Sequence, residues 1–202
     1  MEIMREGILF IVSGPSGSGK TTLTKHLIKR FSDLQFAVSC TTRRQRPGEV
    51  DGVDYRFVSD KEFEEMIHGN RFAEWAIVHG KRYGTPIEEL ERAKSSGVDL
   101  ILDLDVQGAR SIRNKYGLGV YIFVVPSSFD ILKKRLIQRQ SEEKFEIIKR
   151  LEDAKKEMEE IKLYDYIIIN DSLDEALENL AAVVLAERCK KDRVLELIKN
   201  SY

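Results

Sequence analysis

The segment ILFIVSGPSGSGKTT, residues Ile8–Thr22, decides how the chain folds. Its apolar run at 8–12 is typical of a strand buried on both faces. Residues 14–21 then fit G-x-x-x-x-G-K-[ST], and apolar residues recur at helical spacing over 21–31. A glycine loop between strand and helix aims backbone N–H groups and the positive helix end at phosphate oxygens. A Gly/Ser-rich surface turn is the plainer interpretation, but the motif and both flanks favour nucleotide binding.

This motif also predicts which residues contact the nucleotide. Lys20 is expected to reach the outer phosphates, and the hydroxyl of Thr21 is expected to bind Mg²⁺. The predicted contact set of the loop is Gly14, Pro15, Ser16, Gly17, Ser18, Gly19, Lys20, Thr21 and Thr22.

The composition is that of a soluble globular protein. A chain of 202 residues can bury a substantial core, and 42% hydrophobic with 33% charged residues shows no disorder signature. The net charge of −1 gives no reason to expect a nucleic acid or a membrane as partner. Cys40 and Cys189 lack metal-type spacing, which favours a reducing cytoplasm. No apolar run is long enough for a signal peptide or a membrane span.

Four apolar segments indicate the fold class. Strands expected near 8–12, 98–104, 120–125 and 166–169 alternate with helices, which predicts an α/β protein with three α/β/α layers and a mostly parallel sheet. Polar residues follow these strands, among them Asp103, Asp105 and Asn170. Because ligands bind beyond the carboxyl ends of parallel strands, we expect these residues and the glycine loop to share one edge.

Helix boundaries carry their own signals. Ser59 or Asp60 is expected to cap a helix over 61–68, and Ser172 with Glu175 is expected to form a capping box for the last helix. A helix over about 144–162 is predicted from an apolar side that includes Ile148 and Leu151. Segments 71–78 and 81–85 are expected to form a hairpin through His79-Gly80.

The segment 40–56 is a long charged loop with four arginines, Arg43, Arg44, Arg46 and Arg56. Most charge runs are solvated surfaces. Here the arginines stand among Pro, Gly and Tyr residues instead of along a helix face, and guanidinium groups suit phosphate. The residues alone leave a solvated loop and a phosphate site equally open.

Four motifs in order give the chain a family resemblance. GPSGSGKTT, SCTTRRQRPGEVDGVDYRFVS, FAEWAIVHGKRYGT and ILDLDVQG resemble the successive motifs of guanylate kinase, and the resemblance runs from about Ile8 to the end of the chain. It implies phosphorylation of GMP or dGMP by ATP with Mg²⁺. It also implies a P-loop core (1–35, 89–126 and 161–202), an inserted GMP-binding domain (36–88) and a helical lid (127–160).

The same resemblance assigns the substrate residues. The GMP phosphate falls to Arg43, Arg46, Tyr55 and Tyr83, whereas Ser39 and Glu74 match positions that recognise guanine. A carboxylate suits guanine because N1–H and the 2-amino group are adjacent donors that adenine lacks. The remaining matches are Glu49 and Thr85 in the GMP site, Asp103 and Asp105 between the nucleotides (Asp103 also for Mg²⁺), Arg135, Arg139 and Arg150 in the lid, and Asn170 near adenine.

No general base is required, because an acceptor phosphate is already nucleophilic and phosphoryl transfer depends on alignment and charge neutralisation. The three histidines are therefore expected to be structural or solvated. Gln140 and Lys144-Phe145 depart from the family's usual lid. The rival hypotheses are a nucleoside monophosphate kinase for another base and a non-catalytic guanylate-kinase-like module that binds phosphorylated partners.

Overall fold

The computed structural model describes residues 6–78, 80–138 and 144–198. The described chain separates into two compact units, and each is described by itself. The first unit comprises Met1–Phe10 with Asp33–Gly119, and the second comprises Ile11–Ser32 with Val120–Tyr202. The division into a core, a GMP-binding domain and a lid stays a prediction.

The main sheet has five strands in the order β2-β7-β1-β8-β9. Every residue of β1 (Leu9–Ser13) is buried, as its apolar run predicts. In the first unit β2 (Leu34–Phe36) pairs in parallel with β7 (Asp99–Asp103). In the second unit β8 (Val120–Val125) pairs in parallel with β9 (Tyr166–Ile169). The predicted α/β fold with a mostly parallel sheet is confirmed.

One buried carboxylate fixes the start of β7. Asp99 is fully buried, and its Oδ1 accepts a hydrogen bond of 2.8 Å from the backbone N–H of Ile8. The next residue, Leu100, donates its N–H to the carbonyl of Ile8 at 2.9 Å. A buried acid is tolerated here because a backbone donor satisfies it. These bonds hold the residue before β1 against β7.

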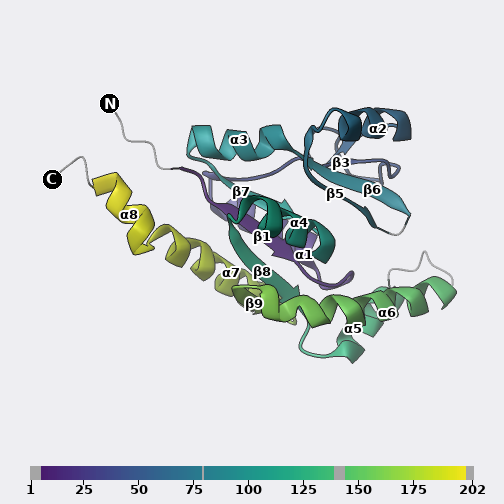
Figure 1. Ribbon diagram of the computed structural model, residues 1–202. Coiled ribbons are helices and arrows are strands. Elements are labelled where there is room, and N and C mark those ends of the chain that lie inside the picture. The colour runs from purple at the N-terminus through teal and green to yellow at the C-terminus, as the bar shows by residue number, and fades with distance from the viewer. Residues whose placement is uncertain (1–5, 79, 139–143, 199–202) are drawn as a thin grey trace. The chain divides into compact units, whose positions relative to one another are not determined.

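The first unit contains a second sheet of four strands in the order β4-β3-β6-β5. Its strands are β3 (Cys40–Thr41), β4 (Arg56–Phe57), β5 (Phe72–Val78) and β6 (Lys81–Pro86). The antiparallel pairing of β5 with β6 confirms the predicted hairpin, although His79 lies outside the described residues. Figure 1 shows α2 (Asp60–His68) beside this sheet, where its Phe63 stacks on Phe72 with ring centroids 4.5 Å apart.

Two helices of the first unit flank β7 in the sequence. Pro86 precedes α3 (Ile87–Ser96), and Gly97 in the left-handed conformation ends it. After β7 comes α4 (Val106–Tyr116), which packs against β5. Lys115, near the end of α4, directs its ammonium group at the carbonyl of Ala73 at 3.4 Å. This hydrogen bond connects the end of α4 to β5 of the hairpin.

The second unit is mostly helical. Its helices are α1 (Lys20–Arg30), α5 (Phe129–Gln138), α6 (Lys144–Glu159), the short 3₁₀ helix η1 (Glu160–Leu163), α7 (Leu173–Arg188) and α8 (Lys191–Ile198). Helices α1 and α7 pack together, and Arg30 of α1 forms an exposed ion pair with Glu178 of α7. No described helix is long and apolar enough to cross a membrane.

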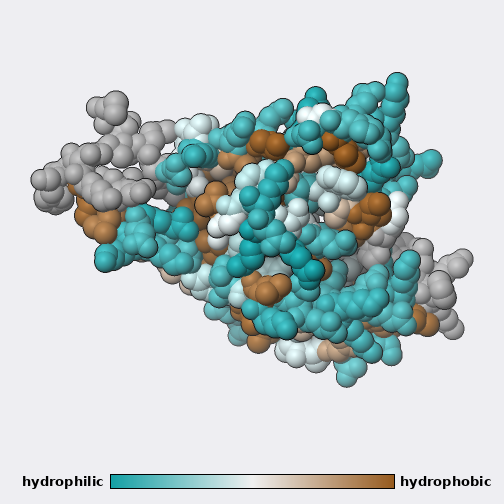
Figure 2. All heavy atoms as spheres, in the orientation of Figure 1, coloured by the Kyte–Doolittle hydropathy of each residue, from teal (hydrophilic) through white to brown (hydrophobic). Residues whose placement is uncertain are grey.

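Helices α5 and α6 meet in a small apolar cluster of Leu132, Leu136 and Ala154, with Leu151 packed against it. The amphipathic pattern predicted this contact for Leu151. It was wrong for Ile148, which stays 56% exposed because the contact with α5 is narrow. Figure 2 shows a mainly hydrophilic surface along α6.

The cap predicted at Ser59 or Asp60 and the capping box predicted at Ser172 have different outcomes. Ser59 forms the complete box, because its hydroxyl accepts from the N–H of Glu62 and the Glu62 carboxylate accepts from the N–H of Ser59. At α7 the prediction was wrong, because the Ser172 side chain makes no capping hydrogen bond. The carboxylate of the neighbouring Asp171 accepts a 2.9 Å hydrogen bond from the N–H of Ser127. This bond connects the segment before α7 to the turn after β8.

This difference gives a paired stability test. We expect Ser59→Ala to lower the free energy of unfolding by about 1 kcal/mol, because it removes a capping bond. Ser172→Ala should change it by no more than about 0.5 kcal/mol. Urea titrations of the two variants and the parent measure both values. Equal losses in the two variants would contradict the assignment of the caps.

Candidate functional site

The glycine loop of the second unit requires glycines at its two ends. Gly14 has a φ of 138°, and a Cβ on it would lie 2.1 Å from the carbonyl oxygen of Val124. Gly19 has a φ of 88°, and its Cβ would lie 2.4 Å from the Asn170 amide nitrogen. Side chains at either position would disrupt the backbone. The loop is thus pressed against the ends of β8 and β9.

Polar groups of this loop suit an anion. The Lys20 ammonium donates to the carbonyls of Gly14 and Pro15 at 2.5 and 3.4 Å, so the cation lies over the loop. The buried hydroxyls of Ser13 and Ser18 have no hydrogen-bond partner among the described residues. Such unsatisfied groups cost about 1–3 kcal/mol, which a ligand with oxygen acceptors can recover. The residues present therefore fit a bound phosphate chain.

Asn170 lies beneath the loop. It is only 6% exposed, and its Nδ2 donates to the carbonyl of Ser18 at 2.7 Å. This contact gives Asn170 a role in positioning the loop that sequence reasoning missed, and its predicted approach to adenine stays untested. Asparagine directly after a strand is a general signal for this edge of the sheet, but it does not indicate which carbonyl the amide contacts.

The predicted lid arginines are placed unequally. Arg135 of α5 directs its guanidinium at the carbonyls of Ser18 and Asp171, at 3.5 and 3.4 Å. Arg150 is partly buried on α6. Arg139 lies outside the described residues, as does Gln140. Arg135 therefore places its charge beside the glycine loop.

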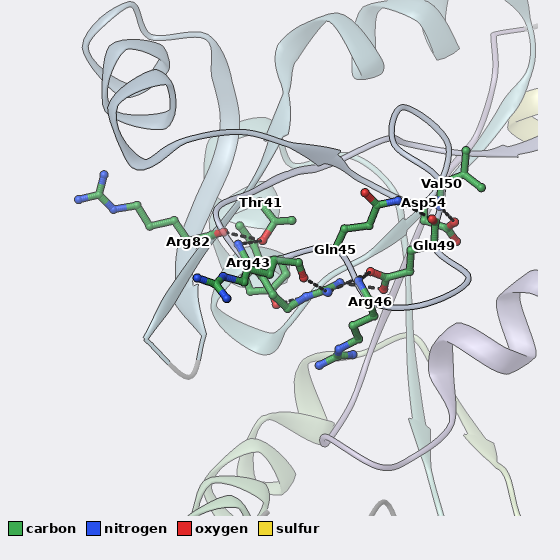
Figure 3. Close-up of polar contacts among 10 residues, drawn as sticks. Thr41, Arg43, Gln45, Arg46, Glu49, Val50, Asp54 and Arg82 are labelled. Carbon is green, nitrogen blue, oxygen red and sulfur yellow. Dashed lines mark hydrogen bonds and ion pairs between the residues drawn. The ribbon is translucent and has the colours of Figure 1, made fainter. Parts of the chain in front are cut away.

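In the first unit the arginine-rich loop is folded around one ion pair. Arg43 forms a bidentate ion pair with Glu49, in which Nη1 donates to Oε2 at 3.0 Å and Nη2 donates to Oε1 at 2.8 Å. Figure 3 shows this pair. Nη1 of Arg43 also donates to the carbonyl of Arg44, and its Nε donates to the hydroxyl of Tyr83 at 3.2 Å. Glu49 further accepts the backbone N–H of Arg46 at 2.8 Å. A merely solvated loop would not need this network.

Aromatic rings complete this cluster. The guanidinium carbon of Arg43 lies 5.3 Å from the Tyr55 ring centroid and 5.6 Å from that of Phe57. Tyr55 and Tyr83 meet edge to face with centroids 5.9 Å apart. The structure thus brings Arg43, Tyr55 and Tyr83 together, and their binding of a phosphate stays a prediction. Arg46 joins through its backbone, while its exposed guanidinium extends away from Glu49 in Figure 3.

Charges in this cluster favour the ionised forms of its ion pair. Burial alone would raise the pKa of Glu49, but hydrogen bonds from Arg43 and Arg46 lower it overall. Burial would likewise lower the pKa of Arg43, and the contacts with Glu49 and Tyr83 raise it instead. Burial, followed by the charge of Asp103, raises the pKa of Tyr55. Tyr55 therefore stays a neutral hydrogen-bond donor.

Glu74 of β5 has a contrasting environment. Glu74 is only 5% exposed. Its Oε1 accepts hydrogen bonds from the N–H and the hydroxyl of Thr85 at 3.0 and 2.6 Å. Thr85 also contacts the Ser39 hydroxyl at 3.2 Å. A register shift between Phe72 and Glu74 places Glu74 opposite Thr85. Ser39 and Glu74, which were predicted to recognise guanine, therefore form one network with Thr85 of the predicted GMP site.

No described residue offers this carboxylate a positive charge. Burial raises the pKa of Glu74 to about 7, and the nearby charge of Asp105 adds to the increase, although the Thr85 bonds oppose it. A buried acid without a cation is a functional-site signal, because it keeps a hydrogen-bonding group available at a cost in stability. Nothing in the sequence indicates this depth of burial.

Asp103 and Asp105 have different positions. Asp103 ends β7, whereas Asp105 is the N-cap of α4 and accepts the N–H of Gly108 at 2.9 Å. Sequence reasoning assigned Asp105 to the nucleotide site and missed the cap, although Asp before a helix is a strong cap signal. Among the described residues no group of three or more His, Cys, Asp or Glu side chains could hold a metal ion.

The mostly parallel α/β fold and its lysine-containing glycine loop define a P-loop nucleotide-binding protein. The guanylate kinase family model matches residues 6–187. The chain belongs to the guanylate kinase family.

Named relatives agree with this assignment over nearly the whole chain. It is 50% identical to a guanylate kinase of Geobacter metallireducens, covering 98% of both chains. It is 43% identical to one of Thermotoga maritima, covering 96% of this chain and 94% of the relative. The crystal structure of a guanylate kinase from Anaplasma phagocytophilum matches with a TM-score of 0.79 and 30% identity, covering 98% of this chain and 95% of that one.

The raised pKa of Glu74 has a measurable consequence. The proton that the folded state retains stabilises it fully below the ordinary pKa of 4.5, and this contribution is lost as pH rises through about 7. Glu74→Gln removes the titration. From pH 5 to pH 8 the parent should therefore lose about 2–3 kcal/mol of unfolding free energy relative to this variant. Urea titrations at both pH values measure the difference.

Glu65→Gln, on the exposed side of α2, is the matched control, and its difference from the parent should be nearly the same at both pH values. A difference between the parent and Glu74→Gln that does not change with pH would show that Glu74 is ionised at pH 5.

Proposed function

We propose that this protein transfers the γ-phosphoryl group of ATP to GMP or dGMP, giving ADP and the nucleoside diphosphate. The observation that carries the assignment is the buried carboxylate of Glu74, with Thr85 and Ser39, in a chain that also has the Lys20 loop. Its place in the guanylate kinase family supports the same reaction. The proposal includes action in the cytoplasm.

On the donor side, the glycine loop would hold the ATP phosphates. Backbone N–H groups at the start of α1 and the Lys20 ammonium supply the positive charge. Mg²⁺ would be held by the Thr21 hydroxyl with Asp103 as a further oxygen donor, since Mg²⁺ prefers such ligands. The ion would neutralise phosphate charge. Arg135, Arg139 and Arg150 are proposed to complete the charge neutralisation from a lid at 127–160.

On the acceptor side, Arg43 and Arg46 would bind the GMP phosphate with the hydroxyls of Tyr55 and Tyr83. Glu49 fixes the Arg43 guanidinium from one side, and the bonds described occupy four of the five N–H groups that an arginine carries. Glu49 is therefore proposed to orient Arg43 instead of contacting a phosphate of its own sign. The tyrosines supply neutral donors.

Base recognition would depend on Glu74. Guanine presents N1–H and the 2-amino group as adjacent donors, and a carboxylate accepts both. Adenine would leave this buried carboxylate unpaired, which is costly. Because burial raises the pKa of Glu74 to about 7, guanine binding to the carboxylate would favour release of a proton near neutral pH. Asp103 and Asp105 are proposed to line the same acceptor region.

A panel of acceptors tests the proposal. With Mg·ATP, the purified protein should phosphorylate GMP and dGMP at least a hundredfold more efficiently than AMP, CMP or dTMP, as followed by ADP formation in a coupled assay. Glu74→Gln should reduce kcat/KM for GMP by tenfold or more. Comparable use of AMP would overturn the assignment of guanine specificity.

Replacing the loop lysine separates transfer from acceptor binding. Lys20→Ala should lower kcat by at least a hundredfold, because it removes the positive charge that lies beside the transferring phosphate. The Kd for GMP, measured by calorimetry, should stay within about threefold of the parent value. Lys25→Ala, a lysine on the exposed side of α1, is the matched control. Full activity of Lys20→Ala would refute the donor site. A parent protein that binds GMP but forms no GDP would instead be a binding module.

A further inference from the structure

Gly108 occupies an unusual position for a glycine. It lies in the first turn of α4, and its φ is not among the positive values of the described glycines. The backbone therefore does not need glycine there. In such a position glycine costs up to about 1 kcal/mol relative to alanine. A local cost of this kind indicates that something outside the helix excludes a side chain.

The excluded space belongs to Glu74. A Cβ on Gly108 would lie 2.7 Å from Oε2 of Glu74 and 3.2 Å from its Cδ. Asp105 Oδ1 would also lie 3.2 Å from that Cβ, because it accepts the N–H of Gly108. The carboxylate and the helix turn are thus in direct contact.

The two oxygens of Glu74 have different surroundings. Oε1 already accepts two hydrogen bonds from Thr85, whereas no described residue donates a hydrogen bond to Oε2. Thr85 therefore fixes one oxygen of a residue that is only 5% exposed, and the other oxygen is left for a ligand. This acceptor lies beside Gly108.

We propose that Gly108 is a specificity-determining positioning residue, whose missing side chain lets Oε2 of Glu74 take the position where it accepts the guanine donors. The inference rests on the proposed function, in which Glu74 recognises the base. Thr85 restrains one oxygen from the hairpin, and α4 limits the other from the opposite side. A methyl group at 108 would displace Oε2 and weaken its bonds to N1–H and the 2-amino group.

The contact has a clear signature in kinetics. Gly108→Ala should raise KM for GMP by about tenfold or more, while kcat at saturating GMP stays within about threefold, since no group on the transferring phosphate changes. The preference for GMP over IMP, which lacks the 2-amino group, should fall by a similar factor. The thermal midpoint should not fall by more than a few degrees, because alanine is the better helix former.

The matched control is Gly69→Ala. Gly69 ends α2 with an ordinary φ of −77°, and it has no contact with Glu74 among those described for its position. This variant makes the same chemical change in the same unit, so its KM for GMP should stay within twofold of the parent. A rise equal to that of Gly108→Ala would mean that the effect is not specific to α4.

A double-mutant cycle with Glu74→Ala tests whether Gly108 acts through the carboxylate. Glu74→Ala should lose most GMP preference, and adding Gly108→Ala should then change KM by less than twofold. If Gly108→Ala alone folds poorly, the double variant should recover the thermal midpoint, because the crowding atoms are gone. Failure of that recovery, or additive effects on KM, would overturn the inference.

The outcomes separate the inference from the proposed function. A parent that makes no GDP, or a Glu74→Ala variant with unchanged GMP use, would remove the function or the base-recognising residue, and the inference with it. A parent that works and loses GMP use in Glu74→Ala, but keeps the parental KM in Gly108→Ala, would overturn the inference alone.

Discussion

The constraint on which the first unit depends is the buried carboxylate of Glu74, to which no described residue brings a positive charge. Ionising Glu74 in low-dielectric surroundings is unfavourable, and the structure offsets only part of that cost through Thr85. The hairpin register, the irregularity after Phe72 and the glycine of α4 all allow the carboxylate to lie where it does. A carboxylate serving stability alone would be expected to carry an ion pair, so this arrangement is best explained by a ligand that completes it.

The second unit also restricts where a charged group can lie, but there the group is the Lys20 cation of the glycine loop. Its glycine loop must approach the ends of two strands closely, and Gly14 and Gly19 make this possible. The Asn170 amide then fixes the Ser18 carbonyl, so the loop has a defined shape before any nucleotide is bound. Lys20 meanwhile donates to carbonyls of its own loop, contacts that a phosphate chain can replace with stronger charge-assisted bonds. Both units therefore hold polar groups in position for a ligand, at a cost in folding stability.

Much of this could be predicted from the sequence, because strong periodic and turn signals are local. The buried strands, the hairpin and the capping box at Ser59 follow from patterns within a few residues. The box predicted at Ser172 was wrong, and the neighbouring Asp171 bonds to the distant Ser127, a contact that no local pattern shows. The same limit hid the contact of Gly108 with Glu74, where 34 positions separate the partners (108 − 74).

The site residues show the same division. Family resemblance assigned Glu74 to guanine and Glu49 elsewhere in the GMP site, but it did not indicate that their environments are opposite. Arg43 keeps Glu49 ionised, so its charge is permanently used in orienting a guanidinium group. Burial and Asp105 leave Glu74 able to exchange a proton near neutral pH.

When two acids have pKa values moved in opposite directions by their surroundings, their chemical roles differ as well. One carboxylate here belongs to the structure of the phosphate site, and the other stays available to the base. The distinction depends on which side chains surround each acid, so it could be drawn only once the folded chain had placed them.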